Sequence, residues 1–373
     1  MSAFREQRLP PWRRAVLKVG SSLLAADAHG LSPRHALGLA QFVSASRTQG
    51  REVVIVSSGA VAAGRTLVPR APEAGAPMAA RQALAALGQA RLMALWQRFF
   101  EVPVAQVLLT HDDLRNRRRY LNARATLLEL LRLGALPVVN ENDTVSVDEL
   151  KLGDNDNLAA IVAALVNADV LFIASDVDGL YSADPRLDPV AQPVQATLGV
   201  SPELMGFAGG AGTRSGTGGM RTKLEAAARA SAAGVDTVIF NGTRQDVHRL
   251  LAEDRLLGTR IQAERSRPAA RKHWLRNAPV GGALAVDAGA VEALRTRGAS
   301  LLAGGVREVV GEFARGDVVE VRDAGGGAVA RGLVQYAAAD VRRIAGRHSR
   351  DIDLLLGYNY GESVVHRDDL VLL

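Results

Sequence analysis

The sequence of 373 residues contains no cysteine. A disulfide framework, a thiolate metal site and a thiol nucleophile are therefore all excluded. The histidines also lack the i, i+4 spacing of a helical ligand pair, so we do not expect a zinc site. No G-x-x-x-x-G-K-S/T segment is present, and no G-x-G-x-x-G segment follows a predicted strand, which excludes a Walker A loop and a dinucleotide-binding fingerprint.

Lysine is scarce, because only four of the 45 basic residues are lysines. These four are Lys18, Lys151, Lys223 and Lys272. A compact ammonium on a flexible stem can enter a phosphate cage that is too small for a planar guanidinium. Each lysine is therefore a candidate for phosphate binding, and the first three lie inside the motifs described below.

Positive charge is unevenly distributed along the chain. The net charge is +6, yet residues 277–373 hold 11 arginines and 13 acidic residues, a net charge of −2. Much of the excess lies in the Arg-rich segment 254–276, which we interpret as a solvated linker. The apolar stretch 158–175 is interrupted by Asn167 and Asp169, so we expect a buried helix and a strand there. The first residues lack the apolar segment of a secretory signal, and we expect a cytoplasmic protein.

Short β-branched runs alternate with helical patterns in the first part of the chain. Strands are predicted at residues 15–19, 53–56, 104–109, 136–139, 170–174 and 237–240. Helices are predicted at residues 33–47, 120–133, 157–167 and 220–233, with further helical segments before residue 100. Strands separated by such helices pair in parallel through right-handed crossovers. The sequence therefore predicts an α/β fold, with an open, mostly parallel sheet sandwiched by helices.

The pattern changes near residue 279 to short strands and Gly-rich turns. Strands are predicted at residues 283–286, 318–321, 332–335 and 363–365. This composition is typical of a small, mainly β domain. We therefore expect a first domain at residues 12–254, a basic linker at 255–278 and a second domain at 279–373.

Two small motifs follow the first two predicted strands. Lys18 and Gly20 end the first strand, and Ser58 and Gly59 directly follow the second. Ligands of open parallel sheets bind at the carboxyl ends of the strands, where backbone N–H groups and a lysine can hold a phosphate. A solvated lysine and an ordinary Ser-capped turn are the simpler alternatives.

A long polar loop follows the fourth strand. Residues 140–144 and 151–157 contain Asn140, Asp143, Asn155 and Asp156. These Asn and Asp residues could simply cap a helix and form turns, but there are more of them here than one helix cap requires. Amides and carboxylates can instead hold the ammonium group of an amino acid, and Asp156 can orient lysines or carry a metal through water.

A Gly-rich loop, residues 216–223, opens the helix before the sixth strand. A loop of this kind at a helix N-terminus is an anion site. We place Lys223 about two turns into the helix, with a stem that reaches a nucleotide phosphate; a flexible surface loop is the alternative.

These parts suit phosphoryl transfer, which depends on positioning and charge neutralisation. A carboxylate acceptor, with a pKa of about 4.3, is already an anion and needs no general base. Lysines from two segments would offset its repulsion from the γ-phosphate.

In this order, the motifs resemble the amino acid kinase family. The matching segments are KVGS at 18–21, SSGAVAAG at 57–64, NEND at 140–143, KLGDNDN at 151–157, SD at 175–176, GLYSADP at 179–185 and GTGGM at 216–220. Two further segments resemble the same family, RRIAGRH at 342–348 and LGYNYG at 356–361, and this C-terminal part is similar to a PUA domain. The resemblance covers nearly the whole chain and implies an amino acid kinase fold followed by a PUA-like domain.

The resemblance implies that ATP, carrying Mg²⁺, phosphorylates the side-chain carboxylate of L-glutamate in the first step of proline synthesis. It implies catalytic roles for Lys18, Lys223 and Asp156. The implied substrate-binding residues are Ser58, Gly59, Asn140, Asp143 and Asn155. The implied ATP-binding residues are Lys18, Gly20, Ser175, Asp176, Thr217, Gly218, Gly219, Met220, Arg221, Thr222 and Lys223. We also expect that the protein supplies no metal ligand, that L-proline inhibits it by feedback, and that it forms a homo-oligomer (a dimer or tetramer).

Two departures from the family pattern are apparent. Ser175 replaces the usual Thr and keeps the hydroxyl, and the Gly-rich run 208–215 can differ in length. Other acceptors of the same fold remain open: N-acetylglutamate, aspartate, carbamate or UMP. An RNA-binding protein and an amino-acid-binding regulator are alternatives of other classes, although the net charge of residues 277–373 argues against RNA.

Overall fold

The computed structural model describes residues 3–24, 31–68, 77–146, 155–185, 187–188, 190–207 and 219–373. The chain divides into two compact units. The first comprises residues 1–115 and 122–267, and the second comprises residues 116–121 and 268–373.

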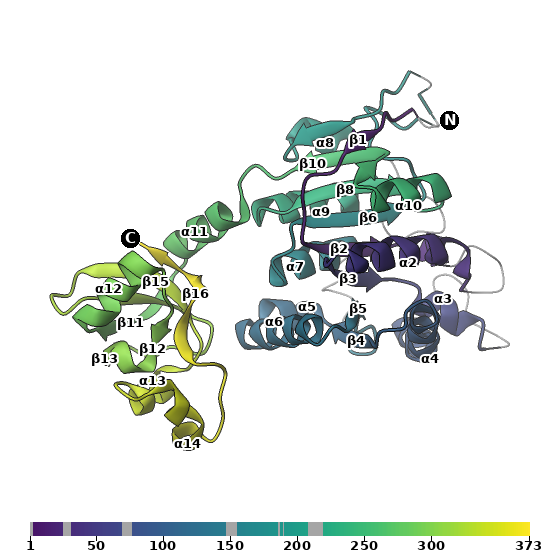
Figure 1. Ribbon diagram of the computed structural model, residues 1–373. Helices are drawn as coiled ribbons and strands as arrows, with labels where there is room; N and C mark the ends of the chain where they lie inside the picture. Colours follow the sequence, from purple (N-terminus) through teal and green to yellow (C-terminus); the bar gives the residue numbers. More distant parts are fainter. Residues whose placement is uncertain are drawn as a thin grey trace. The chain divides into compact units, whose positions relative to one another are not determined.

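The first unit is built on an eight-stranded sheet with the order β4-β5-β3-β2-β6-β8-β10-β7 (Figure 1). Its strands are β2 (Arg14–Val19), β3 (Glu52–Ser57), β4 (Val104–Leu109), β5 (Leu136–Glu141), β6 (Val170–Ser175), β7 (Ala196–Leu198), β8 (Asp236–Asn241) and β10 (Gly258–Gln262). All neighbours from β4 to β8 pair in parallel, whereas β10 runs antiparallel to β8 and parallel to β7. The prediction of an open, mostly parallel sheet is confirmed.

Helices cover both faces of this sheet. The helices of the first unit are α1 (Ser21–Leu24), α2 (Pro33–Thr48), α3 (Ala60–Arg65), α4 (Met78–Gln97), α5 (His111–Arg115), α6 (Arg117–Arg132, from residue 122 onwards), α7 (Asn155–Leu165), α8 (Pro202–Phe207), α9 (Met220–Ala232) and α10 (Gln245–Ala252). Helices α2, α4 and α10 share one apolar core with Leu17, Ile55 and Phe172 of the sheet. Helices α7 and α9 pack against each other, and right-handed crossovers place them on the opposite face.

Every strand predicted in the first unit is confirmed, with boundaries that differ by at most two residues. Both faces of the central strands are buried, so their β-branched runs are clear in the sequence. The stretch 158–175 is a helix followed by a strand, α7 and β6, as predicted. Within the described residues, no helix combines the length and hydropathy needed to cross a bilayer.

The segment interpreted as a basic linker is ordered structure over most of its length. Strand β9 (Arg255–Leu256) pairs with β1 (Gln7–Arg8), β10 joins the main sheet, and α11 (Arg267–Asn277) follows. The interpretation as a solvated linker is therefore wrong for the strands. Thr259 and Ile261 are buried and alternate with arginine and glutamine, and this period-two pattern was masked by the arginine content.

The second unit holds a six-stranded sheet with the order β12-β16-β15-β14-β11-β13. Its strands are β11 (Val280–Val286), β12 (Leu301–Leu302), β13 (Val306–Val310), β14 (Val318–Arg322), β15 (Ala328–Val334) and β16 (Ser363–Leu372). Its helices after α11 are α12 (Ala288–Arg297), η2 (Ala303–Gly305), α13 (Ala338–Ile344), η3 (Ser349–Asp351) and α14 (Ile352–Leu356). The prediction of a small, mainly β domain is confirmed, although its helices and strands β12 and β13 were not predicted.

Candidate active site

The predicted motifs gather at one edge of the first sheet. Because β2, β3, β5 and β6 are parallel, their carboxyl ends meet at this edge. The chain leaves β2 and β3 towards the face that carries α2 and α4, and leaves β5 and β6 towards the face that carries α7 and α9. The strand connections therefore diverge at two points of the sheet, which we term the first crevice (between β2 and β6) and the second crevice (between β3 and β5), because ligands of open α/β sheets bind at such points. Lys18 and Ser175 lie at the first crevice, and Ser58 and Asn140 lie at the second.

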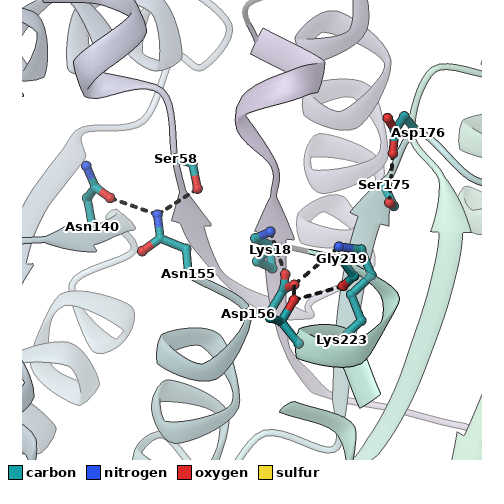
Figure 2. A network of polar contacts seen from close by, with 10 residues as sticks. Lys18, Ser58, Asn140, Asn155, Asp156, Ser175, Asp176, Gly219 and Lys223 are labelled. Atoms are coloured by element: carbon teal, nitrogen blue, oxygen red, sulfur yellow. Dashed lines mark hydrogen bonds and ion pairs between the residues drawn. The ribbon is translucent and has the colours of Figure 1, made fainter. Parts of the chain in front are cut away.

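A buried ion-pair network occupies the first crevice. Figure 2 shows Lys18, Asp156 and Lys223 pointing towards one another. Lys18 Nζ lies 2.5 Å from Asp156 Oδ1, and Lys223 Nζ lies 3.3 Å from Asp156 Oδ2. Thr222 Oγ1 also donates to Asp156 Oδ2, at 3.0 Å. Exposed fractions of 5%, 0% and 6% for Lys18, Asp156 and Lys223 place all three inside the protein, so bulk water screens their charges little.

Asp156 is ionised at neutral pH in this network. Burial raises the pKa of its carboxyl, but the charges of Lys18 and Lys223 and the hydrogen bonds from Lys18 and Thr222 outweigh burial. The pKa is thereby lowered to about 2. Both carboxylate oxygens are engaged by ammonium groups, so the chemistry of this donor set is that of an anion that orients lysines.

Two helices begin at the network. Asn155 and Asp156 open α7, and Met220 opens α9. Helix N-termini carry partial positive charge, which adds to that of the two ammonium groups. Because α9 begins at Met220, Lys223 lies in its first turn, and the prediction of about two turns into the helix is wrong.

Amide groups connect the segments at the second crevice. Asn155 Nδ2 donates to Ser58 Oγ at 2.7 Å and to Asn140 Oδ1 at 3.0 Å (Figure 2). Asn140 Nδ2 donates in turn to Gln89 Oε1 of α4, at 3.0 Å. The predicted trio Ser58, Asn140 and Asn155 is thus brought together, and Gln89 is a member that the sequence did not reveal.

The turn after β3 is held by glycine and by a tryptophan. Gly59 has φ +111°, in the left-handed region that favours glycine, and it precedes α3. Trp96 of α4 donates from Nε1 to Ser57 Oγ at 2.9 Å, and the indole is fully buried. Gly88 lets α4 approach α3, since a Cβ there would lie 1.8 Å from Ala60 O. Backbone and core contacts therefore fix the position of Ser58.

A cavity of about 350 Å³ lies beside the amide groups. Asp143 and Gln89 are among its lining residues, together with Glu141 and Gln106. Burial first, and then the charge of Glu141, raise the pKa of Asp143 to about 6, although Arg81 acts in the opposite direction. A carboxyl group with this pKa is ionised at pH 7 and protonated in mild acid.

The remaining predicted residues have less defined contacts. Ser175 is buried at the end of β6, and its Oγ donates to Asp176 Oδ1 at 3.2 Å. Gly20 lies beside Lys18, because a Cβ there would be 3.7 Å from Lys18 Nζ. Arg221 is exposed and pairs with Glu225 at 3.0 Å. Thr217 and Gly218 lie outside the described residues, as do Lys151 and the run 208–215.

Comparisons with known proteins identify the family. The model of the amino acid kinase family matches residues 13–241, and the model of the PUA domain matches residues 282–356. The first match covers more than half of the chain. The chain therefore belongs to the amino acid kinase family, and the resemblance in sequence is confirmed.

Curated relatives specify the branch of this family. A protein of Xanthomonas oryzae pv. oryzae (strain KACC10331 / KXO85) named glutamate 5-kinase is 71% identical over 362 residues, 96% of this chain and 100% of that protein. A glutamate 5-kinase of Xylella fastidiosa (strain M12) is 68% identical over 377 residues, 100% of this chain and 98% of that protein. Among solved structures, the UMP kinase from Bacillus anthracis matches with a TM-score of 0.49 and 16% identity, over 69% of this chain and 98% of that one.

Proposed function

We propose that this chain transfers the γ-phosphoryl group of ATP to the side-chain carboxylate of L-glutamate. The products are ADP and L-glutamyl 5-phosphate, which enters proline biosynthesis. The observation that carries the proposal is the buried Lys18–Asp156–Lys223 network beside the amides of Asn140 and Asn155. The relatives named glutamate 5-kinase, about 70% identical over nearly the full chain, support glutamate as the acceptor.

The chemistry requires charge neutralisation and little else. A carboxylate oxygen of glutamate attacks the γ-phosphorus, and the bond from that phosphorus to the β,γ-bridging oxygen breaks to release ADP. The acceptor is already ionised near pH 7, so no side chain needs to remove a proton. Lys18 and Lys223 would contact the phosphate oxygens from β2 and α9. Asp156 would act as a positioning residue that keeps the two ammonium groups in place.

The nucleotide would occupy the crevice between β2 and β6. Gly20, Ser175, Asp176 and the segment from Gly219 to Lys223 at the start of α9 would line it. Thr217 and Gly218 are also predicted to bind ATP, but they lie outside the described residues. Mg²⁺ would enter with the phosphates and neutralise part of their charge. Among the described residues no group of three acidic or histidine side chains can hold a metal, and the oxygens of Asp156 already face ammonium groups.

Glutamate would occupy the second crevice and the adjoining cavity. The carboxylate of Asp143 and an amide oxygen suit its α-ammonium group. The hydroxyl of Ser58 and the backbone beside Gly59 suit a carboxylate. The cavity volume of about 350 Å³ is at the lower end of small-molecule sites, which fits a ligand of this size.

Trapping of the acyl phosphate with hydroxylamine tests the proposal. We expect ATP-dependent formation of glutamyl hydroxamate, with much slower turnover of N-acetylglutamate and aspartate. Equal or better turnover of N-acetylglutamate would reject glutamate as the acceptor. Tight RNA binding with a steep salt dependence and no kinase activity would favour the RNA-binding alternative instead.

Feedback by L-proline, a homo-oligomeric state and a cytoplasmic location stay predictions. The hydroxamate assay with and without proline tests the first. Light scattering on the purified chain tests the second.

A further inference from the structure

The side chain of Gln89 links the cavity to the two crevice amides. Gln89 Oε1 accepts from Asn140 Nδ2 at 3.0 Å, and Gln89 Nε2 donates to Gln106 Oε1 at 3.1 Å. Asn140 Oδ1 accepts from Asn155 Nδ2 at 3.0 Å, and the same nitrogen donates to Ser58 Oγ at 2.7 Å. Four amides and one hydroxyl thus form a continuous chain of hydrogen bonds, which we term the amide relay.

The amide relay has one direction. Each amide carries an NH₂ group that only donates and an oxygen that only accepts. Every nitrogen in the relay donates towards the next oxygen, from Asn155 to Asn140, then to Gln89, then to Gln106. Reversal of one amide would bring two donors or two acceptors together, which is unfavourable where water is excluded, as at the buried Asn140. The orientation of Gln89 therefore sets the orientation of Asn140, which is 3% exposed.

This direction determines which groups remain for a ligand. Both N–H bonds of Asn155 Nδ2 are directed at Asn140 and Ser58. Ser58 Oγ accepts from Asn155, so its own O–H is available as a donor to a carboxylate. Asn155 Oδ1 accepts no hydrogen bond from a side chain among the described residues, so it is available to an ammonium group. One donor and one acceptor side by side suit a substrate that carries both a carboxylate and an ammonium group.

The helix that carries Gln89 is held firmly in place. Its neighbour Gly88 allows contact with α3 so close that a Cβ would lie 1.8 Å from Ala60 O. Two turns further along α4, Trp96 donates to Ser57 Oγ. The backbone of α4 at Gln89 is therefore fixed relative to the turn that carries Ser58.

We propose that Gln89 is a positioning residue that gives the site its selectivity for acceptors with an α-ammonium group. The inference rests on the proposed function, because it concerns how that acceptor is chosen. Gln89 acts through Asn140 and Asn155, and loss of its acceptor oxygen removes one of the two described hydrogen bonds that orient the Asn140 amide. A site with a disordered amide relay would no longer penalise an acceptor that lacks the ammonium group.

The test compares L-glutamate with glutarate, which lacks the amino group. For Gln89→Met we expect the KM for glutamate to rise about tenfold and the ratio of kcat/KM for glutamate over glutarate to fall about tenfold. The KM for ATP should change less than about twofold, because the ion-pair network is untouched. Gln89→Glu keeps an acceptor for Asn140, and the exposed Gln106 can turn to donate to it, so this variant should keep the ratio within about threefold of wild type.

A matched control separates selectivity from stability. Gln97 lies on the same helix, and among the described residues its side chain bonds only to backbone groups of residues 100–104. Gln97→Met should lower the melting temperature without changing the ratio. An unchanged ratio in Gln89→Met, or equal losses in Gln89→Met and Gln89→Glu, would overturn the role of Gln89.

Calorimetric titration of glutamate and of glutarate, with a non-hydrolysable ATP analogue present, gives the ratio of their dissociation constants and so measures selectivity without turnover. If the wild-type protein bound glutamate but formed no hydroxamate, the proposed function would be rejected. The ratio of the two dissociation constants in wild type and in Gln89→Met would still test the role of Gln89.

Discussion

Lys18 Nζ and Asp156 Oδ1 lie 2.5 Å apart, and both side chains are almost completely buried. Burial of two charges is costly, and such a pair persists only when further polar contacts satisfy the remaining atoms. Asp156 has these contacts, because Lys223 and Thr222 both approach its other oxygen. The carboxylate is therefore the common counter-ion of two candidate phosphate-binding lysines.

Removal of either lysine should abolish most of the activity. We expect Lys18→Ala and Lys223→Ala each to lower kcat more than about a hundredfold, roughly 3 kcal/mol, because each ammonium stabilises charge that develops during transfer. The hydroxamate assay measures this. Lys272→Ala on α11 removes a lysine outside the first unit and serves as the control. Retention of turnover in either site variant would contradict the two-lysine arrangement.

Neutralisation of Asp156 should destabilise the fold as well as the site. Asp156→Asn keeps the shape but leaves two buried ammonium groups without their counter-ion, which costs about 3–5 kcal/mol. Urea unfolding at pH 7 measures the loss.

The lowered pKa of Asp156 also predicts how the stability of the protein changes in acid. The pKa of Asp156 is lowered from 3.8 to about 2 in the folded protein, so its stabilising contribution is complete above pH 4 and is lost as the pH falls towards 2. The free energy of unfolding of Asp156→Asn should therefore fall less steeply than that of wild type in this range. Parallel curves would show that the ion pairs contribute nothing to stability.

The raised pKa of Asp143 predicts a pH dependence of glutamate binding. An ionised Asp143 suits the α-ammonium group of glutamate, so kcat/KM for glutamate should fall as the pH drops through about 6. Asp143→Asn should have a higher KM for glutamate and no step near pH 6, and Asp143→Ala should raise this KM with the KM for ATP little changed. A wild-type profile that is flat from pH 7 to 5 would disagree with this role.

The contribution of Asp143 to the free energy of unfolding should change with pH in the opposite direction to that of Asp156. Its folded pKa, about 6, lies above the ordinary value of 3.8, so the folded state binds the proton more tightly. The stabilising contribution is complete below pH 4 and is lost as the pH rises through 6. Asp143→Asn should therefore be more stable than wild type at pH 7, a difference that vanishes near pH 4 and that urea unfolding can measure.

The contact between α3 and α4 should not tolerate a methyl group. Gly88→Ala places a Cβ 1.8 Å from Ala60 O, so α4 must shift, at a cost of about 1–3 kcal/mol or more. Gly206→Ala in α8 is the matched control, since a Cβ there has no described atom within 4 Å and alanine favours the helix. Thermal unfolding compares the two. Equal melting temperatures would mean that the helices adjust without cost.

The sequence predicted the parts of the fold whose signals are local. Strands such as β2 and β6 are buried on both faces and read as continuous apolar runs. The antiparallel strand β10 was missed, because its alternation of Thr259 and Ile261 with polar residues spans only five positions inside an arginine-rich segment. The short helices α5 and α8 have few buried residues and hence no clear periodicity.

The residues that meet in the candidate site could be predicted where they belong to short sequence motifs. Lys18, Asp156 and Lys223 each stand in a short motif, and the parallel strand order explains why they meet. Gln89 and Trp96 were not predicted, because they lie in the middle of a helix and act through partners on other segments. A glutamine at an internal position of α4 looks like any surface residue until the fold places Asn140 beside it.

Trp96 also offers a means to observe the acceptor site directly. Its indole is buried and bonded to Ser57, the neighbour of Ser58, so its fluorescence should respond when a ligand changes the hydrogen bonds of that turn. The sequence has only two other tryptophans, Trp12 and Trp274, and replacement of both by phenylalanine would leave a single emitter. The hydrogen bond that holds the turn thereby becomes an optical signal for acceptor binding, separate from ATP and from catalysis.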